Sequence, residues 1–360
     1  MRRRQLLMAL ALGALSAPVL MGQAGSGAPA LNDLARGAGR LWGAAVSSAQ
    51  LDDPNLRRLL LAQVGLIVAE NEMKWETLQP QPGVFRFTAA DRLLDFAERH
   101  GLAMRGHTLV WHRQVPAWLR QLEGRALERA MATHIQTVMG RYRGRLDSWD
   151  VVNEPIADDG TGLRSSFWLD QLGETYIARA LELAHAADPS ARLVINEYGL
   201  EGDAPKSARK RQRFLALLRD LRRRGVPLHA VGLQAHLHAH GGGPTTFDQL
   251  PAFLQAIADL DLDILITELD VNDRDLAAPV ETRDQKVAAV YGAFLEAVLP
   301  QPRLKQLVSW GLSDRDTWLN SAFPRADGQP QRPLPFDADL RRKAATGVIE
   351  QSLRRSSGTP

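Results

Sequence analysis

The 360-residue sequence contains no cysteine, so it can form neither disulfide bonds nor a metal site built on thiolates. Its stability must come from a hydrophobic core, which a chain of this length can supply. An excess of positive charge is missing too. The 44 Lys and Arg residues oppose 41 Asp and Glu residues, and three of the arginines lie at positions 2–4, in a segment that we expect to be removed. This balance argues against nucleic acid as a partner.

The sequence also lacks an apolar run suited to a permanent membrane span, because Pro18 interrupts its most hydrophobic stretch, residues 6–21. Three arginines before this stretch and small residues after it are typical of a removable export signal. The run Arg-Arg-Gln-Leu-Leu at residues 3–7 favours the twin-arginine route over an ordinary Sec signal. We therefore predict a signal peptide over residues 1–30 and a catalytic domain over 31–360. The protein is expected to be exported, periplasmic or secreted, without stable membrane insertion.

After residue 30, short apolar runs alternate with segments of helical spacing. Helical spacing is clear in residues 89–100, 168–187, 214–224 and 283–298. Eight runs are predicted as strands: residues 41–47, 66–71, 102–111, 146–154, 192–198, 230–236, 263–270 and 304–314. Eight strand–helix units predict an α/β fold, namely a (β/α)8 TIM barrel. Since no Ser/Thr/Pro-rich linker interrupts the chain, we predict a single domain, with the proline-rich segment 324–335 as a loop over the barrel face.

Polar side chains gather at the carboxyl ends of the predicted strands, where barrel enzymes carry their chemistry. Glu154 ends the fourth run and precedes Pro155, which cannot donate to a β-ladder. In the seventh run, period-two alternation places Glu268 and Asp270 on one face. Two carboxyl groups facing each other across a barrel mouth suit glycoside hydrolysis, in which one donates a proton and the other attacks the anomeric carbon or activates water. Either glutamate alone would fit equally well as a capped or ion-paired strand end.

Six motifs stand in order along residues 41–350. They are Glu70-Asn71-Glu72-Met73-Lys74-Trp75, Gly106-His107-Thr108-Leu109-Val110-Trp111-His112, Trp149-Asp150-Val151-Val152-Asn153-Glu154-Pro155, Gly232-Leu233-Gln234-Ala235-His236, Ile266-Thr267-Glu268-Leu269-Asp270, and Trp310-Gly311 with Asp314 and Trp318. In these motifs the chain resembles the xylanases of glycoside hydrolase family 10, a group of (β/α)8 endo-β-1,4-xylanases. The resemblance implies hydrolysis of xylan by a retaining double displacement. Glu154 would be the general acid/base and Glu268 the nucleophile, with no cofactor. We expect a monomer.

The same resemblance implies supporting roles around the two glutamates. Asp270 would hold His236, and His236 would keep Glu268 ionised. The residues expected to bind substrate are Glu70, Asn71, Lys74, His107, Trp111, Gln114, Asn153, Gln234, His236, Trp310 and Trp318. The match is weaker at Asn196-Glu197-Tyr198, where the family usually carries a different acid.

Other features have plainer interpretations. Alternating histidines at 236, 238 and 240 suit zinc, but His236 already has a role and glycines follow His240, so we predict no metal site. The basic residues of 209–213 and 222–224 are expected on the solvated face of one helix. The remaining tryptophans are expected to be structural: Trp42, Trp75, Trp118, Trp149 and Trp168.

Three alternative functions remain open at this point. The first is a different retaining barrel glycosidase, acting on cellulose, mannan or mixed-linkage glucan. The second is a carbohydrate-binding protein without catalytic activity, which the presence of both glutamates disfavours. The third is a metal-dependent hydrolase.

Overall fold

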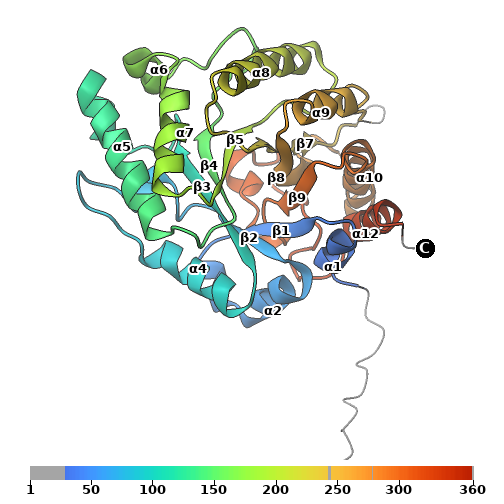
Figure 1. The fold of residues 1–360 in the computed structure, drawn as a ribbon. Helices are drawn as coiled ribbons and strands as arrows, with labels where there is room; N and C mark the ends of the chain where they lie inside the picture. Colours follow the sequence, from blue (N-terminus) through green and yellow to red (C-terminus); the bar gives the residue numbers. More distant parts are fainter. Residues whose placement is uncertain (1–28, 242–244, 278, 359–360) are drawn as a thin grey trace, which may run out of the picture.

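The computed structural model describes residues 29–241, 245–277 and 279–358, which form a closed barrel of parallel strands surrounded by helices (Figure 1). The strands are β1 (Leu41–Val46), β2 (Leu66–Ala69), β3 (Ala103–Val110), β4 (Ser148–Asn153), β5 (Arg192–Glu197), β6 (Ala230–Leu233), β7 (His236–His238), β8 (Asp263–Asn272) and β9 (Leu304–Ser309). Apart from the short β7, most strand residues are buried, and several strands read as nearly unbroken apolar runs. Most of the predicted export signal lies outside the described residues.

Parallel pairing closes the sheet on itself. From β1 to β6 each strand pairs with the next along the chain, β9 pairs with both β8 and β1, and β6 pairs directly with β8. The register sets Leu41 opposite Gln306 between β1 and β9, and Ala230 opposite Asp263 between β6 and β8. The short β7 pairs with the end of β8. The predicted (β/α)8 barrel is therefore confirmed as a single domain.

Helices cover the outside of the barrel (Figure 1). They are α1 (Leu31–Gly37), α2 (Pro54–Gln63), α3 (Trp75–Leu78), α4 (Thr88–Arg99), α5 (Gly124–Arg141), α6 (Phe167–Leu172), α7 (Tyr176–Ala187), α8 (Pro205–Arg223), α9 (Leu250–Ala258), α10 (Val280–Val298), α11 (Leu319–Ala322) and α12 (Ala344–Ser356). In α4 the buried residues Leu93, Leu94 and Ala97 form one face, at the spacing that the sequence shows.

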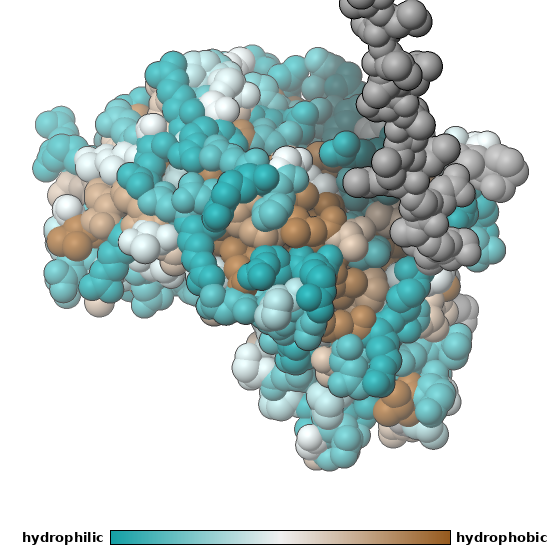
Figure 2. Space-filling model, turned by 90° about the horizontal axis from the view of Figure 1, so that it is seen from below, coloured by the Kyte–Doolittle hydropathy of each residue, from teal (hydrophilic) through white to brown (hydrophobic). Residues whose placement is uncertain are grey.

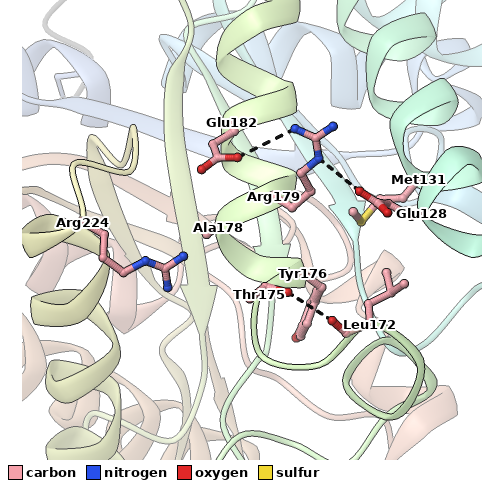
Figure 3. A pocket seen from close by; sticks show the side chains of 9 residues that line it. All are labelled: Glu128, Met131, Leu172, Thr175, Tyr176, Ala178, Arg179, Glu182 and Arg224. Carbon is pink, nitrogen blue, oxygen red and sulfur yellow. Dashed lines mark hydrogen bonds and ion pairs between the residues drawn. The ribbon is translucent and has the colours of Figure 1, made fainter. Parts of the chain in front are cut away.

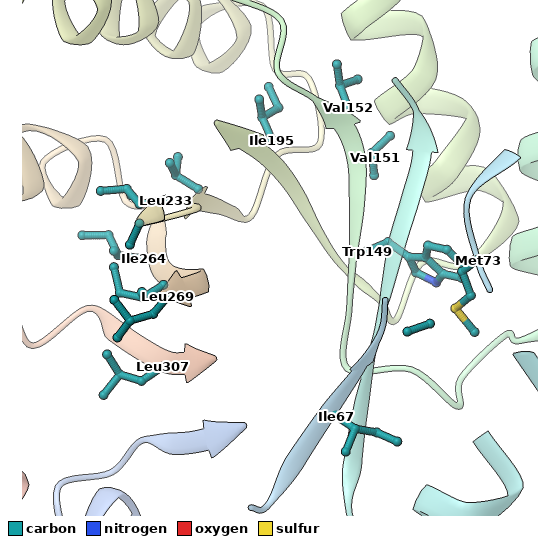
Figure 4. Packing of buried hydrophobic residues seen from close by; sticks show 14 of the residues in the cluster. Ile67, Met73, Trp149, Val151, Val152, Ile195, Leu233, Ile264, Leu269 and Leu307 are labelled. Atoms are coloured by element: carbon teal, nitrogen blue, oxygen red, sulfur yellow. The ribbon is translucent and has the colours of Figure 1, made fainter. Parts of the chain in front are cut away.

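A hydrophobic core cluster packs branched and aromatic side chains of the strands against those of the surrounding helices (Figure 4). Ile67, Ile264 and Leu307 come from three different strands and are completely buried. Trp149 packs over Gly106 so closely that a Cβ atom at residue 106 would lie 2.2 Å from the indole. Only glycine fits at that position on β3. Trp42, Trp75, Trp149 and Trp168 are buried as predicted, and Trp118 is half-buried.

Two predicted elements are interrupted by left-handed residues. Ala235, with a φ of 60°, divides the sixth predicted strand into β6 and β7. Gly173, with a φ of 66°, ends α6 before α7 begins, so the helix predicted over 168–187 is two helices. Hydrophobic spacing continues through both breaks, and it therefore did not reveal them.

The prediction of a solvated basic face on α8 is wrong for two residues. Lys210 is 2% exposed and its Nζ lies 2.9 Å from Oε1 of Glu197. Arg211 is 5% exposed and donates to the carbonyls of Leu200 and Gly202 at 2.8 and 2.6 Å. A run of like charges carries no hydrophobic period, so its buried members could not be distinguished from its exposed ones by spacing.

Hydrophobic residues gather in a hollow band on the face shown in Figure 2, and hydrophilic residues border this band. Within the described ranges, no helix is both long and apolar enough to cross a membrane. The proline-rich segment 324–335 contains neither helix nor strand, as predicted. The N–H of Arg332 in this loop donates to Asp273 at 2.9 Å, directly after β8. The loop therefore lies at the carboxyl end of the barrel.

Candidate active site

Glu154 occupies the turn directly after β4 and is 8% exposed. Its φ of 57° is left-handed, which is uncommon for a residue with a side chain. Its N–H donates to the carbonyl of Asn196 at 2.8 Å. Successive residues of a regular strand point to opposite faces, but this kink lets Asn153 and Glu154 turn to the same site.

Glu268 lies within β8 and is 5% exposed. A chain of hydrogen bonds through three amide side chains joins it to Glu154. Nδ2 of Asn196 donates to Oε1 of Glu268 at 2.7 Å and to Oδ1 of Asn153 at 2.9 Å. Nε2 of Gln234 donates to the same Oδ1 of Asn153 at 3.4 Å and to Oε1 of Glu154 at 3.1 Å. The two glutamates, from strands that β5 and β6 separate in the closed sheet, therefore line one site.

His236 connects Glu268 to a second carboxyl group. Its Nε2 lies 3.1 Å from Oε2 of Glu268, and its Nδ1 lies 2.9 Å from Oδ1 of Asp270. Nε1 of Trp318 donates to the other oxygen of Asp270 at 2.9 Å, and its ring centroid lies 5.1 Å from that of His236. These contacts fix the imidazole of His236 between Glu268 and Asp270, and they hold the indole of Trp318 against the carboxyl of Asp270.

The electrostatics keep Glu268 ionised. Burial alone would raise its pKa, but the hydrogen bond from His236, the charges of His107 and His236, and the hydrogen bond from Asn196 outweigh burial and lower the pKa to about 2. For His236, burial would lower the pKa, but the charge and hydrogen bond of Asp270 together with Glu268 raise it well above 6.5. A protonated histidine therefore faces an ionised glutamate at neutral pH.

Lys74 and two tryptophans form the neighbouring part of the site. Lys74 is 7% exposed and its Nζ donates to Oδ1 of Asn71 at 2.9 Å. The same Nζ lies 5.3 Å from the ring centroid of Trp111 and 6.0 Å from that of Trp310. Aromatic faces beside a cation and an amide form a surface that suits a sugar ring.

The charges of both glutamates also affect the pKa of Lys74. Burial lowers its pKa, while the negative charges of Glu268, Glu70 and Glu154 act in the opposite direction. Burial raises the pKa of Glu70, which Lys74 in turn lowers. The cation, the two glutamates and Glu70 therefore share one electrostatic environment.

His107 is anchored from inside the barrel. Its Nδ1 lies 2.9 Å from Oδ2 of Asp150, and the other oxygen of Asp150 accepts a bond from Arg105 at 2.5 Å. Arg105 and Asp150 are completely buried. The imidazole meets Trp310 edge-on, at 5.3 Å between centroids. The predicted residues so far described fall into one connected site at the barrel mouth.

Gln114 is the exception among the predicted contact residues. It follows β3 with a φ of 46°, and its carbonyl accepts the N–H of Glu76 in α3 at 2.9 Å. In the part of the chain that the structure describes, its side chain makes no hydrogen bond to the amides or carboxyls above.

Two residues outside the predicted binding set contact the glutamates. Asn196 bridges Glu268 and Asn153, and it packs on Gly232, where a Cβ atom would lie 2.2 Å from its Oδ1. Nδ1 of His112 lies 3.7 Å from Oε2 of Glu154. Burial, with the nearby Arg164 and Arg113, lowers the pKa of His112 to about 4, so the ring is neutral at pH 7. In the sequence, Asn196 and His112 both lie near the end of a predicted strand, and this position was the available indication that they contact the site.

The alternating histidines do not form a ligand set. His236 is engaged by Glu268 and Asp270, while the rings of His238 and His240 stack on each other at 5.9 Å. Among the described residues, no group of three or more His, Asp or Glu side chains is arranged to hold a metal ion.

A separate groove of about 220 Å³ lies on the outside of the barrel (Figure 3). Arg179 on α7 reaches across it toward Glu128 on α5 at 3.4 Å and toward Glu182 at 3.9 Å. No residue that lines this groove belongs to the hydrogen-bonded site at the barrel mouth. The groove is therefore separate from the site at the barrel mouth.

Two buried carboxyl groups at the mouth of a closed barrel, one of them held ionised, with amides and indoles around them, are the arrangement of a barrel glycoside hydrolase. The sequence model of "Glycosyl hydrolase family 10" matches residues 30–352. The chain belongs to glycosyl hydrolase family 10.

Individual relatives agree with this assignment. Endo-1,4-beta-xylanase 2 of Claviceps purpurea is 36% identical over 341 residues, covering 94% of this chain and 95% of the relative. An endo-1,4-beta-xylanase of Geobacillus stearothermophilus is 37% identical over 323 residues, covering 84% and 92%. Xylanase 10B of Thermotoga petrophila, solved in complex with xylobiose, superposes with a TM-score of 0.85 at 28% identity, covering 93% of this chain and 100% of that structure.

Proposed function

We propose that this chain is an endo-β-1,4-xylanase, which hydrolyses internal β-1,4 bonds of xylan with retention of the anomeric configuration. Glu268 is the nucleophile and Glu154 the general acid/base. The observation that carries the proposal is the hydrogen-bonded path from Glu268 through Asn196, Asn153 and Gln234 to Glu154. It brings an attacking carboxylate and a proton donor to one sugar.

The reaction has two displacements. In the first, a carboxylate oxygen of Glu268 bonds to the anomeric carbon while the glycosidic C–O bond breaks, and Glu154 gives its proton to the leaving oxygen. In the second, Glu154 takes a proton from water, the water oxygen bonds to the anomeric carbon, and the ester bond to Glu268 breaks. The lowered pKa of Glu268, about 2, supports its role because a nucleophile must be ionised.

The surrounding residues bind the chain of sugars. Asn153 donates to the sugar 2-hydroxyl, a contact that strengthens in the transition state. Trp310 and Trp318 form an aromatic floor and wall, because the C–H faces of a sugar pack on indole. Further contacts come from Glu70, Asn71 and Lys74 toward the non-reducing side, and from His107, Trp111, Gln114, Gln234 and His236 around the cleavage point.

Xylan is the favoured substrate because two relatives described above are named as endo-1,4-beta-xylanases, and the similar xylanase 10B was solved with xylobiose. A product profile on purified xylan, carboxymethyl cellulose, mannan and mixed-linkage glucan tests this choice. We expect short xylo-oligosaccharides of mixed length from xylan and much slower turnover of the other three. Faster release of sugar from a glucan or mannan would show that the chain prefers another substrate. No turnover of any of the four polysaccharides would favour a binding protein without catalytic activity.

The stereochemistry tests the mechanism independently of the substrate. Proton NMR of the first products of xylan hydrolysis should show the β-anomer before mutarotation. An α-anomer formed first would contradict the double displacement, whatever the preferred polysaccharide.

We also propose that the protein is exported and that it is a monomer. The three arginines at positions 2–4 and the apolar stretch after them support a twin-arginine signal. Cell fractionation and N-terminal sequencing of the mature protein should find it outside the cytoplasm and processed near residue 30. Light scattering should give one chain per particle.

A further inference from the structure

The loop that follows the general acid folds back on itself. Ile156 forms an antiparallel bridge with Leu163, and the N–H of Arg164 donates to the carbonyl of Pro155 at 2.7 Å. Nε of Arg164 donates to the carbonyl of Glu154 itself at 3.0 Å. The position of Glu154 therefore depends on how the hairpin of residues 155–164 is held.

A buried carboxyl group lies beneath this hairpin. Glu197, the last residue of β5, is completely buried. Its Oε2 accepts the N–H of Ile156 at 2.9 Å, two residues after Glu154. Its Oε1 accepts the N–H of Tyr198 at 3.1 Å and lies 2.9 Å from Nζ of Lys210. One side chain thus joins β5, helix α8 and the segment that carries the acid.

Helix α8 supplies the counter-charge and a support for the tip of the hairpin. Lys210 is 2% exposed, and its Nζ also lies 3.7 Å from the ring centroid of Tyr198. A Cβ atom at Gly160, where φ is 73°, would lie 2.5 Å from the backbone nitrogen of Lys210. The tip therefore packs directly on the backbone of α8 and can take no side chain there.

The pair of Glu197 and Lys210 costs more free energy than the bonding of one N–H requires. A neutral acceptor would serve Ile156, whereas burying two charges costs free energy that their attraction does not always recover. Burial raises the pKa of Glu197 to about 7, although Lys210 and the bond from Ile156 lower it. The proposed double displacement uses neither residue. A buried ion pair in this position has its most direct effect on the adjacent acid.

We propose that Glu197 and Lys210 are a positioning pair for Glu154, which fixes the peptide of Ile156 and thereby aims the carboxyl of Glu154 at the leaving oxygen. This inference rests on the proposed role of Glu154. Proton donation depends steeply on the placement of the donor. Loss of the pair should therefore slow bond cleavage where the leaving group needs a proton and leave it unchanged where it does not.

The test is the dependence of kcat/KM on the leaving group for a series of aryl β-xylobiosides, from 2,4-dinitrophenyl to unsubstituted phenyl. The variants are Glu197→Gln, Lys210→Met and the double variant. The double variant leaves no unpaired buried charge, so the test can still be made if either single variant fails to fold. We expect a loss of about tenfold or more for phenyl and less than about twofold for dinitrophenyl. The matched control is Arg192→Met, which breaks the contacts with Asp147 and Asp263 at the opposite end of β5 and should leave the slope unchanged.

Equal losses for all leaving groups in the variants, or no loss in the double variant, would overturn the positioning role. The same series on Glu154→Ala separates this failure from that of the proposed function. If Glu154→Ala itself shows no dependence on the leaving group, the role of Glu154 is wrong. If Glu154→Ala shows it and the pair variants do not, only the inference about Glu197 and Lys210 fails.

Discussion

Nε2 of His236 lies 3.1 Å from Oε2 of Glu268, and Asp270 holds the other ring nitrogen at 2.9 Å. In His236→Asn the positive charge against Glu268 is lost while its burial remains, so the pKa of Glu268 should rise from about 2. The acid limb of the kcat/KM profile should move to higher pH. Initial rates between pH 3 and 8 measure this, with His100→Asn, an exposed residue after α4, as the control. An acid limb that stays in place would contradict the assignment.

The same contact makes stability depend on pH. The folded pKa of Glu268 lies below its ordinary value of 4.5, so its contribution to the free energy of unfolding is complete above that value and is lost as pH falls toward 2. The folded pKa of His236 is raised, so its contribution is complete below pH 6.5 and is lost as pH rises through the raised pKa. Chemical denaturation at several pH values should show that His236→Asn flattens both dependences.

Glu268→Ala should abolish turnover of xylan while the fold is kept. Removing a nucleophile lowers kcat by about 10⁴-fold or more, because the covalent path is closed. Initial rates and circular dichroism measure the two effects. Glu182→Ala, on the exposed side of α7, is the control and should retain full activity. Near-native rates in Glu268→Ala would show that another group attacks the sugar.

Glu154→Ala should discriminate between substrates. Loss of general acid catalysis costs about 10²–10⁴-fold where the leaving group must be protonated. Hydrolysis of xylan should therefore fall by this factor, whereas formation of the glycosyl-enzyme from a dinitrophenyl xylobioside should hardly change. Burst kinetics with the activated substrate measure that step. An equal loss on both substrates would count against the acid role.

Trp318→Phe keeps an aromatic ring but removes the N–H that donates to Asp270 at 2.9 Å. Without this bond the indole wall and Asp270 are no longer held together, so we expect kcat/KM on xylan to fall by about tenfold, which corresponds to about 1.4 kcal/mol of transition-state stabilisation. Trp118→Phe is a matched control, because its N–H donates to the carbonyl of Gln79 outside the hydrogen-bonded site. If both variants behaved alike, the loss would reflect general packing rather than the site.

Excess EDTA should leave the rate on xylan unchanged, because the proposed steps use only carboxyl groups and water. Inhibition by EDTA that added divalent metal reverses would favour the metal-dependent alternative. A full rate after prolonged dialysis against the chelator would exclude it.

Much of the fold was predictable because eight apolar runs and the helices between them follow simple periodicities. The breaks at Ala235 and Gly173 were not, since they arise from single backbone conformations within continuous hydrophobic spacing. Glu154 and Glu268 were predicted as the catalytic pair from their places near the ends of predicted strands and from the motifs around them. Asn196 and His112 were missed as contacts of the glutamates, because a bond such as Asn196 to Glu268 joins residues 72 positions apart. Only the closed barrel brings such residues together.

The left-handed backbone at Glu154 carries a consequence for engineering. A side chain at such a φ costs about 1–2 kcal/mol, and glycine relieves this strain. Glu154→Gly would relieve this strain, but it would also raise the entropy of the unfolded chain and remove the bond from Gln234 to Oε1 of Glu154. The same change would delete the proposed proton donor, so a search for more heat-resistant variants that could substitute residue 154 should select for activity at the same time.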